Sequence, residues 1–462
     1  MNIRKVEYAI IGSGTAGLGA YSKIRHQSDN FVMIEQGPYG TTCARVGCMP
    51  SKMLITAADH AHEMTHASKF GIYGEPEVDD KQVFNRIRTD RANKFVGNVL
   101  KQIGKIPDQF KLQGCAKFLS NNQIQVDDDL IIQAEKVVIA CGTRPYIPEE
   151  LKAVAGKILT SDTVFEIDRL PNSIAVIGIG VIALELGQSL HRLGVETSFF
   201  GRTGTIGNLT HPDLQAETLK CLSQELNILP QGRIVEAWEE DNAVFIAYEQ
   251  QDGCVITKRF DAILVAAGRV SNIDQVDIHK TDIQLETNGI PVFDPRTMQC
   301  GNLPIYIAGD ATNDLSLWHE AYDEGRIAGI NALNYPQAEK VTRKTPLGIY
   351  FTDPQMAIVG QSYHQLRGTQ IVIGDVPFNS PRHEVWKKTQ GRIQVYLDAS
   401  SGEILGAELL GHQAEHLAHL LALAITHKMT ADQFLEMPIY HPSAEEVLKK
   451  ALDNARFQLT KI

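Results

Sequence analysis

The sequence predicts an α/β fold built from two Rossmann-like units, followed by a C-terminal α+β region. Two glycine-rich turns each follow an apolar run and precede a helical pattern. From about residue 345 the pattern changes to alternating strands and then amphipathic helices. Because 462 residues exceed what one hydrophobic core accommodates, we expect several domains.

Composition limits the class of protein. Hydrophobic residues make up 43% and charged residues 21% of the chain, as in ordinary soluble proteins. A net charge of -11 argues against nucleic acid and anionic membranes as partners. Seven cysteines are unlike a secreted disulfide scaffold, and the longest apolar run, residues 174–184, is too short to cross a bilayer. We therefore expect a cytoplasmic enzyme.

The first Rossmann-like unit begins with an apolar strand at residues 6–11. A helix to about residue 27 and a strand at residues 31–34 follow, and the strand ends at Glu35. The glycines of the intervening turn allow close approach to a pyrophosphate at the helix N-terminus; they are Gly12, Gly14 and Gly17. Glu35 is placed to hydrogen-bond a ribose diol. This order of strand, helix, strand and acid predicts a dinucleotide site.

The second unit repeats the pattern with a strand at residues 174–177, a helix to residue 193 and a strand at residues 197–200. Its turn contains Gly178, Gly180 and Ala183. Two such units imply two dinucleotides, with electrons passing between them. A duplicated domain that has lost its ligand is the alternative.

The two units differ at the ribose-binding position. Glu35 lies 21 residues after Gly14, whereas the same count from Gly180 reaches Gly201, followed by Arg202. An acid at this position favours NAD, and its absence beside an arginine suits a ribose 2′-phosphate. We therefore favour NADPH over NADH, with a solvated loop arginine as the alternative.

A cysteine pair follows the first unit. Cys43 and Cys48 are separated by about 7.5 Å of rise in an undistorted helix, more than the ~6.8 Å that a disulfide spans between Cα atoms. Bridging them needs a bent or late-starting helix, for which Gly47 and Pro50 are suitable. A thiol at a helix N-terminus has a stabilised thiolate, which suits redox exchange. Two unrelated cysteines are the alternative.

This motif closely resembles the redox-active disulfide of the flavin-dependent pyridine nucleotide–disulfide oxidoreductases, which include dihydrolipoamide dehydrogenase, glutathione reductase and mercuric reductase. The resemblance covers essentially the whole chain and implies FAD in the first unit. It also implies an ion pair between Lys52 and Glu185 near the flavin. The further cofactor-binding residues that it implies are Thr42, Lys52, Ala116, Gly142, Gly268, Asp310 and His319.

The resemblance also implies the domains and the acid–base group. The FAD-binding domain is expected at residues 1–150, completed by 281–344, the NAD(P)-binding domain at 151–280 and a dimerisation domain at 345–462. Near the C-terminus, His441 matches the family's acid–base histidine and Glu446 the carboxylate that orients it. Because that histidine serves the other subunit's active site, a homodimer is implied.

The predicted activity is a dihydrolipoamide-dehydrogenase-like transfer of electrons from NAD(P)H through FAD and Cys43–Cys48 to a small disulfide or lipoyl-type group. A pyridine nucleotide transhydrogenase or oxidase with idle cysteines, and a non-catalytic dimeric flavoprotein component, are the alternatives. Arg45 either acts on the thiol or an anionic substrate, or faces solvent. Residues 53–110 are expected to be helical; His62 and His66 share a helix face there, but without a third ligand we expect no metal.

Overall fold

A computed structural model describes residues 2–461. The described chain divides into two compact units, and each is considered by itself. Unit 1 comprises Met1–Met53, Phe84–Tyr146 and Gly268–Arg343, and unit 2 comprises Leu54–Val83, Ile147–Ala267 and Lys344–Ile462. The domain boundaries expected from the sequence stay a prediction.

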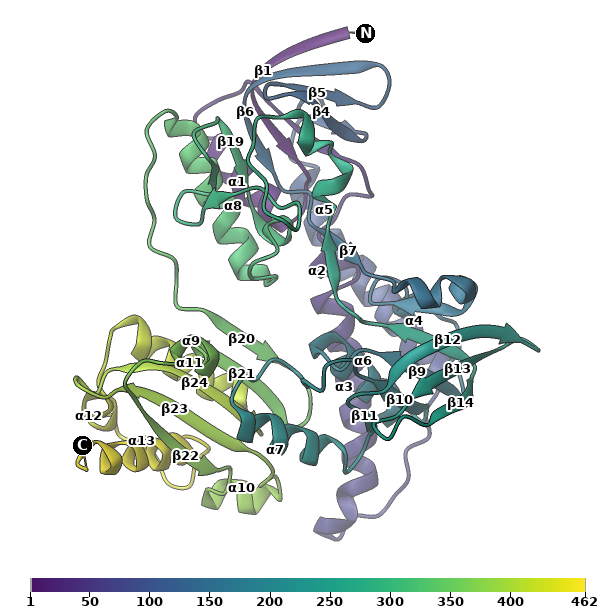
Figure 1. The fold of residues 1–462 in the computed structure, drawn as a ribbon, viewed down its shortest axis with the longest axis vertical. Helices are drawn as coiled ribbons and strands as arrows, with labels where there is room; N and C mark the ends of the chain where they lie inside the picture. The colour runs from purple at the N-terminus through teal and green to yellow at the C-terminus, as the bar shows by residue number, and fades with distance from the viewer. Residues whose placement is uncertain (1, 462) are drawn as a thin grey trace. The chain divides into compact units, whose positions relative to one another are not determined.

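Unit 1 is organised around a mixed sheet in the order β17-β18-β19-β6-β1-β2-β3, with β5 joining β4 to β6 (Figure 1). The central strands β1, β2, β6 and β19 run parallel, as a Rossmann-like unit requires. The strands are β1 Asn2–Ile11, β2 Phe31–Glu35, β3 Lys111–Gln113, β4 Ala116–Ser120, β5 Gln123–Val126, β6 Leu130–Ile139, β17 Phe293–Asp294, β18 Gln299–Cys300 and β19 Ile305–Ile307. A separate pair joins β7 Thr143–Pro145 to β16 Arg269–Ser271.

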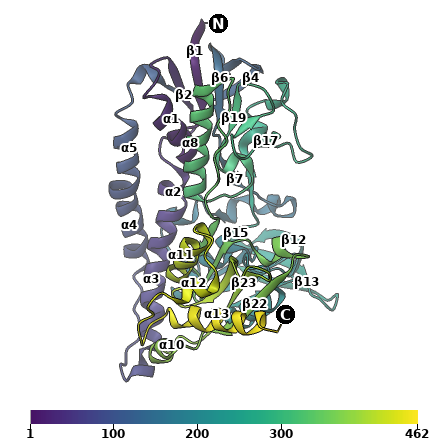
Figure 2. The ribbon, with the colours of Figure 1, turned by 90° about the vertical axis from the view of Figure 1, so that its left-hand side faces the viewer.

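Two helices of unit 1, α1 Thr15–Ile24 and α8 Trp318–Asn334, pack side by side against the sheet (Figures 1 and 2). Small residues allow this close approach: a Cβ added to Gly325 would lie 2.0 Å from the carbonyl oxygen of Ala16. A larger side chain there would push the helices apart. The remaining short helices of the unit are α2 Thr42–Arg45 and α5 Gly97–Ile103.

Unit 2 contains a parallel sheet in the order β11-β10-β9-β15-β8 and an antiparallel sheet β12-β13-β14. Strand β9 is fully buried, which agrees with its continuous apolar sequence. The elements are β8 Ile158–Thr160, β9 Ser173–Ile177, β10 Glu196–Phe200, β11 Asn227–Leu229, β12 Arg233–Glu240, β13 Ala243–Glu249, β14 Val255–Phe260, β15 Ala262–Val265, α6 Val181–Arg192 and α7 Pro212–Leu222.

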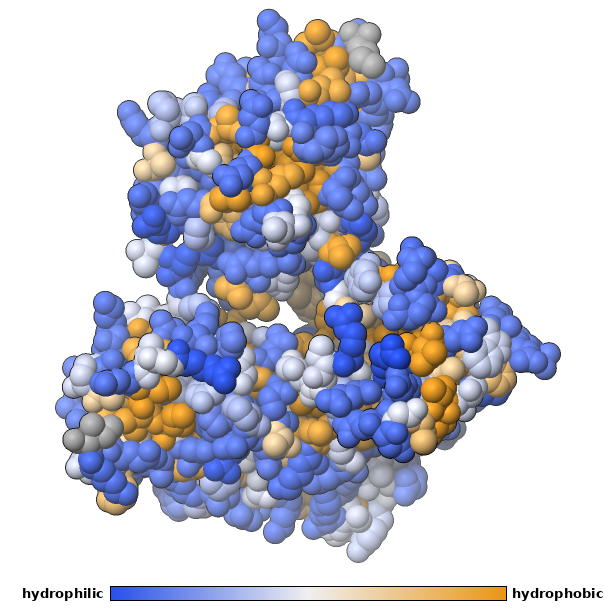
Figure 3. Space-filling view, viewed as in Figure 1, coloured by the Kyte–Doolittle hydropathy of each residue, from blue (hydrophilic) through white to orange (hydrophobic). Residues whose placement is uncertain are grey.

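The C-terminal part of unit 2 is an antiparallel sheet in the order β20-β21-β24-β23-β22, covered by helices. Alternate residues of these strands and the apolar faces of α11 and α13 form one buried cluster. The elements are β20 Leu347–Tyr350, β21 Gln355–Gly360, β22 Ile371–Pro377, β23 Arg392–Asp398, β24 Ile404–Gly411, α9 Tyr363–Leu366, α10 Pro381–Trp386, α11 Ala414–Thr426, α12 Ala431–Leu435 and α13 Glu446–Leu459. In Figure 3, hydrophobic side chains gather over β23 and the helices beside it.

The predicted α/β class with a C-terminal α+β region is confirmed. The long helical stretch expected at residues 53–110 is wrong in part, because the chain leaves the helix between α3 Cys48–His66 and α4 Asp80–Asp90. Gly71, at φ +78°, ends the turn after α3 in a conformation that favours glycine. None of the described helices is long and apolar enough to span a bilayer.

Candidate active site

The predicted cysteine pair lies where one helix ends and the next begins. Helix α2 ends at Arg45, and α3 begins at Cys48 itself, so Cys48 occupies a helix N-terminus. The late start agrees with the geometry that the five-residue spacing requires. Thr41 caps α2, because its hydroxyl oxygen accepts from the backbone N–H of Ala44 at 3.2 Å. This threonine thus acts as a helix cap, a role its residue type permits.

The structure holds the two cysteines as a hydrogen-bonded dithiol. The hydrogen bond with Cys48 is the largest cause that raises the pKa of the Cys43 thiol, and burial adds to it. The positive charge of Lys52 acts in the opposite direction. Because the two thiols interact, the loss of a proton from one of them affects the loss of a proton from the other.

The residues around the pair differ in exposure. Thr42 is exposed, Arg45 is half-buried, and the Lys52 ammonium lies 3.4 Å from the Ser51 hydroxyl oxygen, to which it donates. A Cβ on Gly40 would lie 2.9 Å from Cδ of Arg45, so the aliphatic part of this arginine packs against the backbone. Arg45 therefore packs its stem in unit 1 rather than standing fully in solvent.

The first glycine turn is shaped by close backbone contacts. Gly12 has φ +105°, and a Cβ there would lie 2.2 Å from the carbonyl oxygen of Ala140. A Cβ on Gly17 would lie 2.0 Å from the carbonyl oxygen of Gly12. Gly14 precedes α1 and has no atom within 4 Å of its added Cβ, which leaves open space at the helix N-terminus. Such an N-terminus presents unsatisfied N–H groups to an anion.

Glu35, at the end of β2, is fixed by backbone and hydroxyl donors. Its Oε2 accepts from the N–H and the hydroxyl of Ser13, both at 2.7 Å, and its Oε1 accepts from the N–H of Gly37 at 2.9 Å. Ser13 was not predicted as a site residue. Its place inside the glycine turn is the signal that could have identified it.

Asp310 lies beside two residues that sequence reasoning did not assign to the site. The hydroxyl of Thr143 donates to Asp310 at 3.3 Å, and Arg269 donates to the hydroxyl and to the carbonyl of Thr143, both at 2.9 Å. Burial raises the pKa of Asp310, although the charge of Arg269 opposes the shift. Gly142 and Gly268, both at positive φ, immediately precede these partners.

The N-terminal part of α8 contributes a buried polar atom. Nε2 of His319 is buried and has no hydrogen-bond partner among residues 2–461. Further along α8, Glu324 accepts from the N–H of Gly309 at 2.8 Å and from Arg343 at 2.7 Å, and burial raises its pKa to about 7. Glu324 and Arg343 thus hold the turn that leads to Asp310; neither was predicted. Ala116, which was predicted, is buried at the start of β4.

The second glycine turn, in unit 2, repeats the geometry of the first. Gly178 has φ +112°, and a Cβ there would lie 2.5 Å from the carbonyl oxygen of Ala266. Gly180 has open space at the start of α6, and Ala183 is buried within that helix.

The position after β10 explains why the second unit has no ribose acid. A Cβ on Gly201 would lie 2.5 Å from the carbonyl oxygen of Pro230 and 2.6 Å from Cδ1 of Ile179. An acidic side chain therefore has no room at Gly201, whereas Arg202, the next residue, is exposed.

Glu185 of α6 is buried and accepts from the backbone N–H of Phe351 at 2.8 Å. Lys52, its predicted partner, belongs to unit 1 and Glu185 to unit 2. Their ion pair stays a prediction.

The predicted acid–base pair lies at the start of α13. Nδ1 of His441 lies 2.9 Å from Oε1 of Glu446, and the backbone N–H of Ser443 donates to Oε2 at 3.2 Å. The hydrogen bond from His441 lowers the pKa of Glu446. The His441 side chain is 70% exposed, so its second ring nitrogen is available to another molecule. The cysteines belong to unit 1 and this pair to unit 2.

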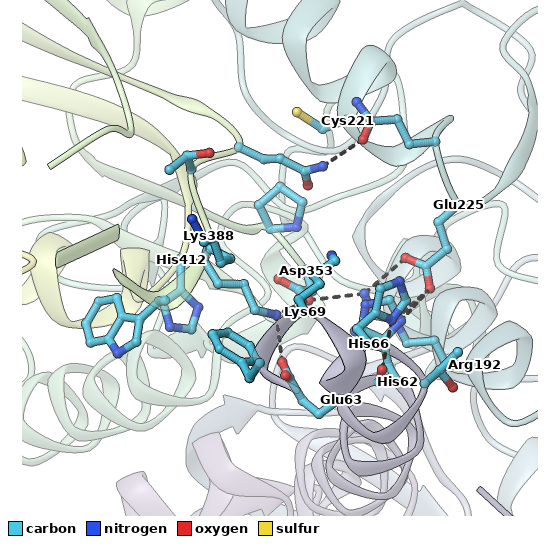
Figure 4. A pocket seen from close by; sticks show the side chains of 18 of the residues that line it. His62, Glu63, His66, Lys69, Arg192, Cys221, Glu225, Asp353, Lys388 and His412 are labelled. Atoms are coloured by element: carbon cyan, nitrogen blue, oxygen red, sulfur yellow. Dashed lines mark hydrogen bonds and ion pairs between the residues drawn. The ribbon is translucent and has the colours of Figure 1, made fainter. Parts of the chain in front are cut away.

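Unit 2 also contains a polar cavity of about 670 Å³ beside the second half of α3 (Figure 4). Arg192, only 4% exposed, pairs there with Asp59 at 3.0 Å, Glu225 at 2.7 Å and Asp353 at 3.1 Å. Residues 2–461 include no group of three or more histidine, cysteine or acidic side chains placed to hold a metal ion.

His62, in this cavity, is expected to make the free energy of unfolding depend on pH. Burial, followed by the charge of Arg192, lowers the pKa of His62 from 6.5 to about 4. Between these values the unfolded chain binds a proton that the folded chain does not, so the free energy of unfolding falls as the pH falls. We expect this contribution to reach about 3 kcal/mol at pH 4. Urea unfolding followed from pH 7 to pH 4 measures it.

The matched variants are His62→Gln and His60→Gln. His60 is exposed on the same helix, so its replacement should keep the wild-type pH dependence. His62→Gln should flatten the dependence between pH 6.5 and pH 4. An unchanged slope in His62→Gln would show that another group is responsible.

Comparison with known proteins places the chain in a family. Residues 6–325 match the family model described as pyridine nucleotide-disulphide oxidoreductase, and residues 347–452 match its dimerisation domain. A dihydrolipoyl dehydrogenase of Haloferax volcanii is 29% identical, with 97% of this chain and 96% of that protein covered. A mycothione reductase of Mycobacterium tuberculosis is 30% identical, with 96% and 98% covered.

Among solved structures, the HOCl-induced flavoprotein disulfide reductase RclA from Escherichia coli superposes with a TM-score of 0.81 at 21% identity, covering 97% of this chain and 99% of that chain. This likeness concerns the fold. The family models match almost the whole length, and the resemblance predicted from the cysteine motif is confirmed. The chain belongs to the pyridine nucleotide-disulphide oxidoreductase family.

Proposed function

We propose that the protein reduces a small disulfide with electrons from NAD(P)H, using Cys43 and Cys48 as its exchange dithiol. The observation that carries this proposal is that two free cysteines interact where α2 ends and α3 begins, with Cys48 at the N-terminus of α3. Neighbouring thiols at a helix N-terminus are suited to thiol–disulfide exchange. The family membership supports the same class of reaction.

Three observations of unit 1 support FAD as the resident cofactor. Gly14 leaves open space before α1, where a pyrophosphate would bind. Glu35 is held at the end of β2, where a carboxylate hydrogen-bonds the ribose of a dinucleotide. Asp310 is a buried carboxylate whose pKa is raised, as expected where a hydroxyl-bearing ligand completes its surroundings. Nε2 of His319 is buried and makes no hydrogen bond among the described residues, although it lies 3.7 Å from Oε1 of Glu320. When bound, FAD supplies two-electron transfer between a nicotinamide and the dithiol.

The chain's own residues then carry out the exchange. The thiolate of Cys43 attacks one sulfur of the substrate, forming a mixed disulfide and releasing the first substrate thiol. His441, held through Nδ1 by Glu446, takes the proton of the Cys43 thiol as that thiol attacks and gives it to the leaving thiolate. The thiolate of Cys48 attacks Cys43 in the mixed disulfide, which releases the second thiol and leaves a Cys43–Cys48 disulfide. We propose that His441 acts on the cysteines of a second chain in a homodimer, which the dimerisation domain supports.

The proposed substrate is a dihydrolipoamide-type or other small disulfide, and the proposed compartment is the cytoplasm. Relatives about equally similar to this chain are named for lipoyl and for mycothione substrates. Steady-state rates with lipoamide, glutathione disulfide and mycothione would rank these substrates. Equal and negligible rates with all disulfides would contradict the proposed reaction.

Anaerobic titration of the flavin-loaded protein with NADPH and with NADH tests the proposal directly. Long-wavelength charge-transfer absorbance after two electrons is expected from a thiolate beside the flavin. Rapid NADPH–NAD exchange without that absorbance would favour a transhydrogenase with idle cysteines. No flavin reduction by either nucleotide would favour a non-catalytic component.

We propose NADPH as the preferred donor, and Arg202→Ala tests this preference. A charge-assisted hydrogen bond contributes about 1.5–3 kcal/mol, so we expect kcat/KM for NADPH to fall about 10- to 100-fold and that for NADH to change little. Arg259→Ala is the matched control, because Arg259 is also an exposed arginine of unit 2. Equal effects on both nucleotides would contradict the assignment of Arg202.

A further inference from the structure

A buried serine–histidine pair contacts the loop that carries His441. Ser380 and His383 lie at the start of α10, and both are fully buried. The Ser380 hydroxyl lies 2.6 Å from Nδ1 of His383 and donates to the carbonyl oxygen of Ser443 at 3.2 Å. Ser443 is two residues beyond His441. The pair thus reaches the acid–base loop from a separate element of unit 2.

Ser380 does not use its side chain to cap the helix. A serine at an N-cap usually accepts a hydrogen bond from the first helical turn. Ser380 occupies the N-cap of α10 but makes no such bond, whereas Ser362, at the N-cap of α9, forms a capping box with Gln365. The hydroxyl of Ser380 therefore contacts the side chain of His383 and the loop instead of a backbone N–H of the first turn of α10.

The loop itself is held through the backbone of Ser443. Its N–H donates to Oε2 of Glu446, and Oε1 of the same carboxylate contacts Nδ1 of His441 at 2.9 Å. The hydroxyl of Ser443 is buried and has no hydrogen-bond partner among residues 2–461. The Ser380 hydroxyl binds the carbonyl of Ser443 while Glu446 binds the N–H of the same residue, so the two side chains hold Ser443 from either side.

The two hydrogen bonds of Ser380 depend on the tautomer of His383. Ser380 has one hydroxyl hydrogen, so if it donates to the carbonyl of Ser443, Nδ1 of His383 has to donate to the Ser380 oxygen. In the other tautomer Ser380 donates to Nδ1, and Nε2–H faces the carbonyl of His412. Nε2 of His383 faces the carbonyl oxygen of His412 at 3.5 Å. Edge-to-face contact with Trp386, at 5.6 Å between ring centroids, holds the imidazole in this orientation.

We infer that Ser380 and His383 are positioning residues for the acid–base step of His441. They hold the Ser443 carbonyl and so the geometry in which Glu446 meets the imidazole. The inference rests on the proposed function, because it assumes that His441 moves the proton. The rate of proton transfer by His441 then depends on a buried hydrogen-bond network of Ser380 and His383 that lies outside the expected site.

The first test measures kinetics of the flavin-loaded dimer. Because small misplacement of a catalytic group costs up to about 100-fold, Ser380→Ala should lower kcat for the disulfide about 10- to 100-fold. KM for the disulfide and the rate of flavin reduction by the nicotinamide should stay near wild type. Ser380→Thr, which keeps the hydroxyl, should recover most of kcat. Ser362→Ala removes a true helix cap from the same unit and should leave kcat unchanged.

The second test changes the histidine. The amide nitrogen of asparagine can replace Nδ1 as donor, so His383→Asn should retain most of kcat, and His383→Leu should lose as much as Ser380→Ala. ¹⁵N NMR of histidine-labelled protein should report the Nδ1–H tautomer of His383, with conversion to Nε2–H in Ser380→Ala. This readout does not depend on turnover.

Two outcomes overturn the inference alone. The first is a wild-type kcat in folded Ser380→Ala, and the second is an Nε2–H tautomer of His383 in the wild-type protein. In both cases His441→Ala still slows disulfide reduction. Wild-type turnover in His441→Ala would instead contradict the proposed function. The two failures are therefore distinguishable.

Discussion

Cys43→Ser is expected to abolish disulfide turnover while flavin reduction by the nicotinamide proceeds at nearly the wild-type rate. A serine hydroxyl is not ionised near neutral pH and cannot form a mixed disulfide, so the exchange step has no nucleophile. Cys43 is half-buried and Cys48 exposed, which means that the variant removes one member of the pair without opening the core. Stopped-flow measurement of each half-reaction separates the two rates.

The control for this experiment is Cys254→Ser. Cys254 is an exposed cysteine of unit 2, remote in sequence from the pair, and its replacement should leave both half-reactions unchanged. If Cys43→Ser still turned over disulfide, Cys43 would not be the exchange thiol. Cys48→Ser should also stop multiple turnover, since the mixed disulfide on Cys43 would then have no resolving thiol.

His441→Ala is expected to slow disulfide turnover by about 10²- to 10⁴-fold, the usual range for a general acid–base group. The imidazole is exposed and is oriented by Glu446 at 2.9 Å, so its loss removes the proton donor without leaving a cavity. Glu446→Gln should have a smaller effect in the same direction, because the amide keeps a hydrogen bond but not the charge that stabilises the imidazolium. Flavin reduction by the nicotinamide should stay unaffected.

Two measurements sharpen the histidine experiment. His427→Ala replaces another exposed histidine of unit 2, which caps the end of α11, and should not change the exchange rate. If His441→Ala slowed flavin reduction and disulfide exchange equally, His441 would have no specific role in proton transfer. Partial recovery of the exchange rate by added imidazole would support the assignment.

The order of the sequence motifs predicted much of the fold, because a glycine-rich turn between a strand and a helix is typical of a Rossmann-like unit. A Cβ added to Gly12 or Gly178 would meet a carbonyl oxygen that directly follows a neighbouring strand, so the glycines that mark the turn in the sequence are also the ones that the packing requires. The antiparallel C-terminal sheet was predictable from its alternating pattern. The break after α3 was missed although the sequence marks it with Gly71, Gly74 and Pro76, residues that disfavour a continuous helix.

Partners brought together from distant segments were not predictable. Arg269 and Thr143 meet beside Asp310 because β7 pairs with β16, and Glu324 reaches Gly309 from within α8. No spacing rule in the sequence relates these positions. These contacts can be recognised only after the strands and helices are arranged in three dimensions.

The sequence by itself predicted the family and the α/β class, and it contains the five-residue spacings of Cys43 and Cys48 and of His441 and Glu446, because each of these depends on local order along the chain. Only the tertiary structure shows that an acidic side chain has no room at position 201. It also shows that the hydroxyl of Ser380 binds the loop that carries His441. These features depend on the space and the hydrogen bonds that separate segments offer one another. The order of residues along the chain specifies neither this space nor these hydrogen bonds.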